Sequence, residues 1–398
     1  MNCRKIGKGG FQMTTTLSYH SRTKILFGEG IYQNLPSEIE KLVGKEKILI
    51  VTDQGVKMVG LLEKVENVLK AAGFNVESYS DVKPDPSSIQ IDEVANLIRS
   101  RNVKCVVGLG GGSAMDVAKM ATLVSADSHN TLHYALMQNP FQQTDIVNIA
   151  IPTTSGTGAE VTSTVVFSDT EGRKVWGWDE NMAPTVAVLD PTFTANLPVH
   201  LTVATTLDAL IHAMEAVSGR RSNPIIEALS YQSIRLINEN YEKVLVDPQD
   251  IEARGNLSLG ATLAGQAIEQ GGTGLAHCIG HALGTLEKIP HGRAVAISLY
   301  ETIDWLVANA PESYKPIALA MDIEWNPQAP KKVAERYKHL VTIGQLDLSV
   351  GEAKERETRI SQLVQIMQGQ ENQPMLQNSC AIPTVEELAS FANSILKS

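Results

Sequence analysis

Two short motifs combine acidic and imidazole side chains at helical spacing. Asp208 and His212 lie four residues apart in an apolar, Ala-rich run, so both side chains lie on one face of the predicted helix. His277 and His281 repeat this spacing, and His291 follows a proline at the predicted end of the second helix. One carboxylate and several imidazoles are the usual ligands of zinc or ferrous iron. The sequence therefore predicts a divalent metal site, against the alternative of histidines that only fill core or surface positions.

A glycine-rich segment, Gly108-Leu-Gly-Gly-Gly-Ser113, follows a predicted strand and precedes a predicted helix over 114–121. Glycines let the backbone approach a pyrophosphate closely, and the N-terminus of a helix offers unpaired N–H groups. The segment departs from the usual dinucleotide fingerprint, because Ser113 occupies the third glycine position and Asp53 precedes the glycines instead of following them. A tight turn between strand and helix is the alternative interpretation.

A second loop strengthens the case for a dinucleotide. Pro152-Thr-Thr-Ser-Gly-Thr-Gly-Ala-Glu-Val-Thr162 follows another predicted strand and is rich in hydroxyl groups and glycine. Such a loop suits hydrogen bonding to phosphate or nicotinamide amide groups. No glycine loop ends in Gly-Lys-Ser/Thr, which excludes a Walker nucleotide site, and no His-Glu-x-x-His motif supports a zinc hydrolase.

Composition limits the remaining classes. The 398 residues, 43% hydrophobic and 20% charged, are enough for two packed cores. The formal net charge of −10 argues against nucleic acid or anionic lipid as a partner. No apolar run reaches the roughly 18 residues of a membrane span, and the start lacks the apolar stretch of a signal peptide. The four cysteines are scattered, which predicts a reduced, cytoplasmic enzyme.

The pattern of apolar residues along the sequence changes near residue 195. Before it, short β-branched runs alternate with amphipathic stretches, which indicates a parallel sheet covered by helices. The predicted strands are 47–52, 75–79, 105–109, 149–152 and 185–189, with helices at 60–72 and 89–101. After it the periodicity is helical, over 204–218, 224–244, 251–269, 294–308, 330–343, 350–368 and 385–396, with a polar loop at 368–377.

We therefore predict a flexible tail at 1–18, an α/β dinucleotide-binding domain of Rossmann-like type at 19–195, and an all-helical metal-binding and catalytic domain at 196–398. The predicted metal ligands fall in the helical half and the nucleotide signals in the α/β half. We expect a cleft between the domains to bring them together.

Taken together, these segments resemble the iron-containing (group III) alcohol dehydrogenase family over almost the whole chain. The motifs that carry the resemblance are residues 110–119, 152–162, 188–191 and 208–212, and the fourteen-residue step from His277 to His291. The resemblance implies a dehydroquinate synthase-like architecture and hydride transfer between a nicotinamide cofactor and a small alcohol or aldehyde. It also implies a homo-oligomer, dimeric or larger.

The resemblance also implies residue roles. It makes Asp208, His212, His277 and His291 the ligands of Fe²⁺, with Zn²⁺ or another divalent ion possible. It assigns His281 to the substrate side as a proton-relay group.

For the cofactor, the resemblance places the loop residues Gly110, Gly111, Gly112 and Ser113 on the pyrophosphate. It implies that Thr153, Thr154 and Lys174 contact the cofactor. Asp53 corresponds to the acid that faces the adenosine ribose, where a carboxylate accepts hydrogen bonds from both hydroxyls and repels a 2′-phosphate. NAD is therefore expected over NADP.

Two departures from the family pattern concern the substrate pocket. The segment Asn378-Ser-Cys380 is followed by Ala381-Ile-Pro383, where the family usually has Asn-Pro-Arg, and it is shortened. Trp176 and Trp178 replace small or aliphatic residues near the cofactor cleft.

Other functions fit these features less well. A dehydroquinate-synthase-like lyase would need several cationic side chains in the cleft, and the helical half offers Arg220, Arg221 and Arg293 but no lysine cluster. A glycerol dehydrogenase or a maleylacetate reductase fits the full set of one aspartate and three histidines less well. A non-enzymatic metal-binding or scaffold protein leaves both glycine-rich turns unexplained.

Overall fold

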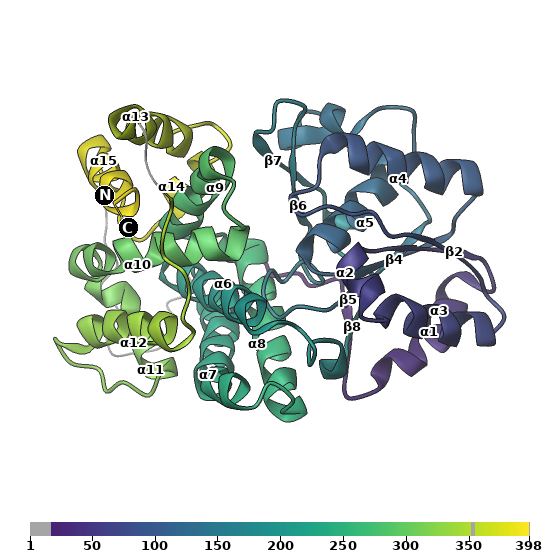
Figure 1. Ribbon diagram of the computed structural model, residues 1–398, viewed down its shortest axis with the longest axis horizontal. Helices are drawn as coiled ribbons and strands as arrows, with labels where there is room; N and C mark the ends of the chain where they lie inside the picture. Colours follow the sequence, from purple (N-terminus) through teal and green to yellow (C-terminus); the bar gives the residue numbers. More distant parts are fainter. Residues whose placement is uncertain (1–16, 352–354, 398) are drawn as a thin grey trace.

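The computed structural model describes residues 17–351 and 355–397. An α/β part is followed in sequence by a helical part, and the two lie side by side (Figure 1). The predicted tail at 1–18 falls almost wholly outside the described residues. The last strand ends at Leu189 and the next long helix begins at Val199. The expected change from α/β to helical structure therefore occurs in the short segment between them.

The α/β part is built on a parallel sheet of six strands in the order β1-β8-β5-β4-β2-β3. Its strands are β1 Lys24–Phe27, β2 Lys47–Val51, β3 Asn75–Tyr79, β4 Cys105–Gly110, β5 Val147–Pro152 and β8 Val186–Leu189. An antiparallel pair, β6 Thr164–Ser168 and β7 Lys174–Trp178, was not predicted. Because β2, β4 and β5 are neighbours, the loops after their carboxyl ends lie at one edge of the sheet.

Helices cover both faces of this sheet. They are α1 Leu35–Val43, α2 Gln54–Met58, α3 Leu61–Ala71, α4 Ser88–Arg101 and α5 Gly112–Val124. Alternate residues of β2 enter different cores, since Leu49 packs with α4 and α5 whereas Ile48 packs with α1 and α3. Burial on both faces accounts for the continuous apolar runs of the strands.

The helical part contains ten α-helices within the described residues. They are α6 Val199–Ser218, α7 Pro224–Val246, α8 Ile251–Gly271, α9 Leu275–Glu287, α10 His291–Asn309, α11 Lys315–Ala320, α12 Ala329–Ile343, α13 Arg356–Met367, α14 Gln373–Asn378 and α15 Val385–Ile395. Among the described residues, no helix combines the length and apolar character needed to cross a membrane.

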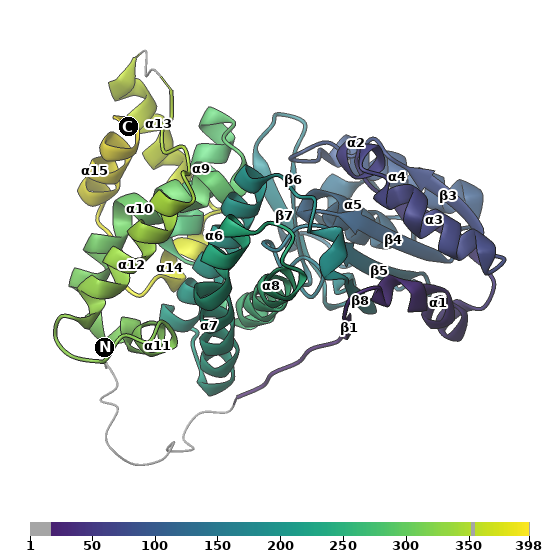
Figure 2. The same ribbon diagram turned by 60° about the horizontal axis from the view of Figure 1, so that its bottom comes forward.

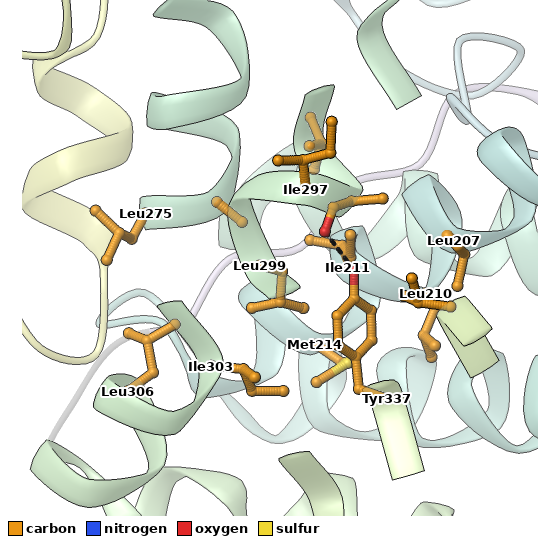
Figure 3. Close-up of a cluster of buried hydrophobic side chains, with 14 of the residues drawn as sticks. Leu207, Leu210, Ile211, Met214, Leu275, Ile297, Leu299, Ile303, Leu306 and Tyr337 are labelled. Atoms are coloured by element: carbon orange, nitrogen blue, oxygen red, sulfur yellow. Dashed lines mark hydrogen bonds between the residues drawn. The ribbon is translucent and has the colours of Figure 1, made fainter. Parts of the chain in front are cut away.

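One apolar cluster forms the centre of the helical part (Figure 3). Leu207, Ile211 and Met214 on α6 pack into it, and the Tyr337 hydroxyl donates a 2.9 Å hydrogen bond to the Ala296 carbonyl. The Tyr337 ring is thereby buried with its polar atom satisfied. This packing fixes the position and rotation of α6, whose other face carries Asp208 and His212.

Close backbone contact joins the two parts, and α8 is one of the helices that face the α/β part (Figure 2). A Cβ atom added to Gly158 would lie 2.4 Å from Gly265 Cα, so only glycine fits at this crossing. The Thr262 hydroxyl also donates to the Glu160 carboxylate at 2.8 Å. The expected juxtaposition of the two parts is therefore made by α8 and the loop after β5.

Two predictions in the C-terminal region were wrong. The helix expected at 350–368 begins instead at Arg356, and Gly351 has φ of +83°, a left-handed conformation that interrupts helical geometry. The loop expected at 368–377 contains the start of α14. Met375 and Leu376 are buried against the helical core, so burial of two apolar side chains outweighs the polar composition of this short segment.

Candidate active site

Four side chains from α6, α9 and α10 converge on one point. Asp208, His212, His277 and His291 each offer a ligand atom, and these atoms all lie within 4.8 Å of one another. Asp208 Oδ1 is 3.5 Å from His277 Nε2 and 3.6 Å from His291 Nε2. Ligands placed tetrahedrally about 2.0–2.1 Å from a zinc ion would stand roughly 3.4 Å apart. These two separations are close to those of atoms that share an ion.

Unsatisfied polar atoms give independent support for a cation at this point. Asp208 Oδ1, His212 Nδ1 and His277 Nε2 are buried and have no hydrogen-bond partner among the described residues. Buried polar atoms are rarely left unpaired, because losing water without a replacement is costly. Three such atoms within one cluster fit a divalent cation, so the residues present suit the metal that the sequence predicts.

The electrostatics of the cluster favour ligation. Burial lowers the pKa of His212 to about 4, opposed by the charge of Asp208. Burial likewise lowers the pKa of His291 to about 4, with Lys174 contributing. Burial alone would raise the pKa of Asp208, but the neighbouring His212 and His291 lower it below its ordinary value. At neutral pH these three residues therefore present two neutral imidazoles and a carboxylate, the forms that bind metal.

Glu215 is a further member of the site that the sequence analysis missed. It lies on α6, and its carboxylate contacts His277 Nδ1 at 2.6 Å while accepting backbone N–H bonds from Gly274 at 2.8 Å and Ala276 at 2.7 Å. Because the carboxylate can only accept, in the neutral imidazole it holds the proton of His277 on Nδ1 and leaves the Nε2 lone pair facing Asp208.

This contact also shifts the titration of His277. Burial by itself would lower the pKa of His277, but the charges of Glu215 and Asp208 raise it to about 9. The spacing of Asp208, His212 and Glu215, at i, i+4 and i+7 on one helix face, is the sequence signal that could have identified Glu215.

His281 lies beside the four predicted ligands but outside their cluster. Its ring centroid is 5.4 Å from that of His291 and 6.4 Å from that of His277. Burial, aided by the charges of His291 and Lys174, lowers the pKa of His281 well below its ordinary value. A neutral imidazole next to the ligands can accept a proton, which suits the relay role expected for it.

The predicted pyrophosphate loop joins β4 to α5. Gly110 ends β4, Gly111 caps α5, and Gly112 and Ser113 form its first turn. A Cβ atom at Gly110 would lie 2.8 Å from Ala114 Cβ, and one at Gly112 would lie 2.8 Å from the Thr157 side chain. Because no side chain fits at Gly110 or Gly112, the backbone N–H groups at the start of α5 stay uncovered, which suits the binding of a phosphate group.

Asp53 occupies the end of β2 next to this loop. It is the N-cap of α2, and its Oδ1 accepts the Val56 N–H at 3.0 Å. Its second oxygen, Oδ2, lies 3.2 Å from where a Cβ of Gly110 would be. One oxygen therefore stabilises the local backbone, while the other is directed toward the glycine loop.

The threonines after β5 face the same loop. Thr153 is buried, and its N–H donates to the Gly110 carbonyl at 2.9 Å. The Thr154 hydroxyl oxygen is buried with no hydrogen-bond partner among the described residues, and this side chain lies 3.6 Å from a Cβ placed on Gly111. An unpaired hydroxyl beside the glycines fits a polar cofactor group.

Lys174, on β7, belongs to the metal side of the site. Its Nζ pairs with Asp85 Oδ1 at 2.7 Å, and its Cε and Nζ lie 3.2 Å and 3.4 Å from a Cβ placed on Gly284. Burial is the main cause that lowers the pKa of His281 and of His291, and the charge of Lys174 lowers both further. The structure thus places Lys174 beside the histidines instead of beside the glycine loop.

The loop after β5 packs against α6 close to the metal cluster. A Cβ atom at Gly156, in the loop after β5, would lie 2.7 Å from Thr205 Cβ on α6, one turn before Asp208. A Cβ atom at Gly292, next to His291, would lie 2.6 Å from the Ala204 carbonyl oxygen. Glycines therefore permit α6 to approach both the nucleotide side and the start of α10, which brings the two predicted sites together.

Comparison with known proteins gives a consistent result. Residues 22–191 match the profile described as iron-containing alcohol dehydrogenase, and residues 202–346 match the C-terminal part of the same family. An NAD-dependent methanol dehydrogenase of Bacillus methanolicus is 35% identical over 69% of this chain and 72% of its own. A 1,3-propanediol dehydrogenase of Klebsiella pneumoniae is 31% identical over 78% and 80%. A solved 1,3-propanediol oxidoreductase is 26% identical, has a TM-score of 0.87, and covers 96% of this chain and 100% of its own.

Proposed function

Since the chain belongs to the iron-containing alcohol dehydrogenase family, we propose that it interconverts a small alcohol and the corresponding aldehyde with a nicotinamide cofactor and a divalent metal ion. One observation carries this proposal. The loop after β5, with its unpaired Thr154 hydroxyl, lies against α6 one turn before Asp208. A cofactor on the loop and a substrate at the cluster would therefore be neighbours, as direct hydride transfer requires.

Asp208, His212, His277 and His291 would hold the metal. When bound, a divalent ion supplies Lewis acidity to an alcohol or carbonyl oxygen. The chain's contribution is to keep two imidazoles neutral and one carboxylate ionised. Iron is the metal implied by the family, and the ligand set is equally suited to zinc.

His281 would move the proton. Its neutral imidazole lies outside the ligand cluster and can accept a proton during alcohol oxidation and return it during aldehyde reduction. Lys174 supports this state, because its positive charge disfavours a protonated His281. Overall, hydride and proton leave the alcohol for the nicotinamide and for His281 or solvent.

The cofactor would bind along the carboxyl edge of the sheet. The backbone of Gly110, Gly111, Gly112 and Ser113 would hold the pyrophosphate, and Thr153 and Thr154 would contact the nicotinamide half. Asp53 would accept the ribose hydroxyls through Oδ2, which favours NAD over NADP. The nicotinamide itself supplies or accepts the hydride. Lys174 would contact only the part of the cofactor that lies next to the metal cluster.

We also propose that the enzyme is cytoplasmic and assembles into a dimer or a larger homo-oligomer. Support for the location comes from the cysteines, since Cys105, Cys278 and Cys380 are all free thiols in the described part of the chain. The oligomer rests on the family resemblance alone.

A direct assay tests the proposal. Metal-stripped protein would be loaded anaerobically with Fe²⁺ or Zn²⁺ and given a panel of short aldehydes with NADH or NADPH. We expect metal-dependent oxidation of NADH with at least one aldehyde. No turnover with any aldehyde, with either metal and either cofactor, would contradict the proposed function.

A further inference from the structure

A cavity of about 560 Å³ lies between the two parts of the molecule. The α/β part contributes Trp176 and Leu136 to its lining, and the helical part contributes Arg220, Arg221, Gln373 and their neighbours. In Figure 1, β7, which carries Trp176, faces α9 and α14 across the boundary between the parts. None of the four predicted metal ligands lines this cavity, so it is distinct from the cluster.

The charge of this cavity is opposite to that of the chain. The protein has a formal net charge of −10, yet the described lining residues include two arginines and no carboxylate. Neither Arg220 nor Arg221 forms a salt bridge within the described parts of the chain. Glu371, in the turn before α14, has its carboxylate against Gly369. Two guanidinium groups in one concave site without a counter-ion favour an anionic ligand.

The arginines stand on a rigid turn. Asn378 is buried, and its side-chain nitrogen donates to the carbonyls of Gly271 at 2.8 Å and Thr273 at 2.9 Å. The same residue accepts the backbone N–H groups of both arginines, Arg220 through its carbonyl at 2.9 Å and Arg221 through its side-chain oxygen at 3.2 Å. The turn that carries the two arginines is therefore stabilised by the buried Asn378 side chain, whose own polar atoms are hydrogen-bonded.

One wall of the cavity is also fixed. The Trp176 indole N–H donates to the Glu371 carbonyl at 3.3 Å, which ties β7 to the turn before α14. Trp176, Leu136 and Pro374 give the cavity apolar surface next to its charged end. The lining thus offers contacts for a hydrocarbon chain as well as for an anionic group.

Two elements lead from the metal cluster to this cavity. On β7, Lys174 lies beside the histidines. Trp176 follows two residues later, lies on the same face of the strand and lines the cavity. On α6, His212 lies in the cluster, and Arg220 follows the end of the helix eight residues later. At 1.5 Å per residue, that is about 12 Å along the helix axis between the two backbones, a span that a long arginine side chain can shorten.

We propose that the substrate is a short aldehyde whose far end carries an anionic oxygen group, a carboxylate or a sulfonate, held by Arg220 and Arg221. This inference rests on the proposed function, because it places the aldehyde carbon at the metal cluster. Reduction adds hydride from NADH to the carbonyl carbon and a proton to its oxygen, and the anionic group at the other end is unchanged. Trp176 flanks the carbon chain between them.

Matched aldehydes test this assignment. Steady-state reduction by the metal-loaded enzyme would be measured with 4-oxobutanoate, with 3-oxopropane-1-sulfonate and with butanal, which have similar lengths. We expect kcat/KM at least about tenfold higher for one of the anions than for butanal, mainly through a lower KM, because hydrogen bonds to charged groups are the strong ones. The two anions show which oxyanion the site accepts.

Variants at the two arginines test whether they cause the preference for an anionic aldehyde. Arg221→Gln should lower kcat/KM for the preferred anion about tenfold and leave butanal within about twofold, and Arg221→Lys should restore part of the loss. Arg220→Gln tests the second guanidinium, whose Nε donates to the Ser379 carbonyl. Arg235→Gln on α7, which removes a surface arginine paired with Glu239, is the matched control and should change neither substrate.

Two results would overturn the inference and leave the proposed function standing. One is a wild-type preference for butanal over both anions, and the other is an equal loss for butanal and the anions in Arg221→Gln. Failure of the wild-type enzyme to reduce any aldehyde would instead contradict the proposed function itself.

Discussion

The metal cluster and the glycine loop differ in what the chain contributes to each. In the cluster, four side chains from three helices offer ligand atoms to a metal ion, and three of the four residues are buried. In the loop, glycines remove side chains so that backbone N–H groups at the start of α5 can be approached. A site whose ligands are side chains should lose binding when one side chain is removed. A site that binds through backbone N–H groups should lose binding mainly when a larger residue replaces a glycine. The two sites should therefore respond independently to mutation.

Removal of a metal ligand should have the largest effect. We expect Asp208→Ala and His277→Ala to lose bound metal and to lower turnover by about 10³-fold or more, since Lewis-acid assistance contributes several kcal/mol. NADH affinity should be unchanged, because the proposed cofactor contacts lie on the α/β part. Metal content by mass spectrometry and NADH binding by fluorescence check both. Retained metal stoichiometry in either variant would remove that residue from the ligand set.

Substitution of His281 should separate proton transfer from metal binding. His281→Ala should keep its metal but lower kcat by about 10²–10⁴-fold, the usual contribution of a general acid–base group. Metal content and kcat measured on the same preparation test this. If the metal is lost with the rate, His281 is a ligand and the assignment of the other histidines is wrong.

Glu215→Gln should weaken the metal site without removing a ligand. A glutamine can satisfy one backbone N–H but presents an NH₂ group elsewhere, so it no longer holds the His277 proton on Nδ1. Loss of such an outer contact typically lowers metal affinity by about 10–100-fold. Chelator competition would measure the affinity, and the visible spectrum of the Co²⁺-loaded protein would report the altered ligand field.

Glu63→Gln, an exposed position on α3, is the control for the Glu215 variant. Turnover of Glu215→Gln should recover at saturating metal, because all four ligands remain. An unchanged affinity and an unchanged Co²⁺ spectrum would show that Glu215 only stabilises the start of α9.

Asp53→Gly should have the smallest effect and leave the metal site untouched. Glycine is tolerated at an N-cap, so the loss of the bond to Val56 should reduce stability by only a few tenths of a kcal/mol. The loss of Oδ2 should shift the ratio of specificity constants toward NADP by about tenfold, or about 1.4 kcal/mol. Steady-state kinetics with NADH and NADPH test this. An unchanged ratio in the folded variant would leave Asp53 as a helix cap alone.

Periodicity identified the elements that carry the site but not every feature around them. The strand at 105–109 was predictable because a strand buried on both faces is a short continuous apolar run. The long helices of the second half were predictable because their apolar residues recur with period 3.6. The pair β6–β7 was missed because burial along β7 does not follow the residue types, since Lys174 and Gly177 are buried whereas Trp178 is exposed. Glu215 was missed because its partners, Gly274, Ala276 and His277, are about 60 residues away and meet it only in the fold.

Reversible metal removal is the most direct test that the metal and the cofactor bind at separate sites. Protein stripped by a chelator would be assayed for NADH binding and for aldehyde reduction, before and after addition of one equivalent of Fe²⁺ or Zn²⁺ per chain under anaerobic conditions. We expect unchanged NADH affinity throughout, loss of nearly all turnover on stripping, and its return at one equivalent of metal. Full turnover by the stripped protein would contradict a role for the metal in the reaction.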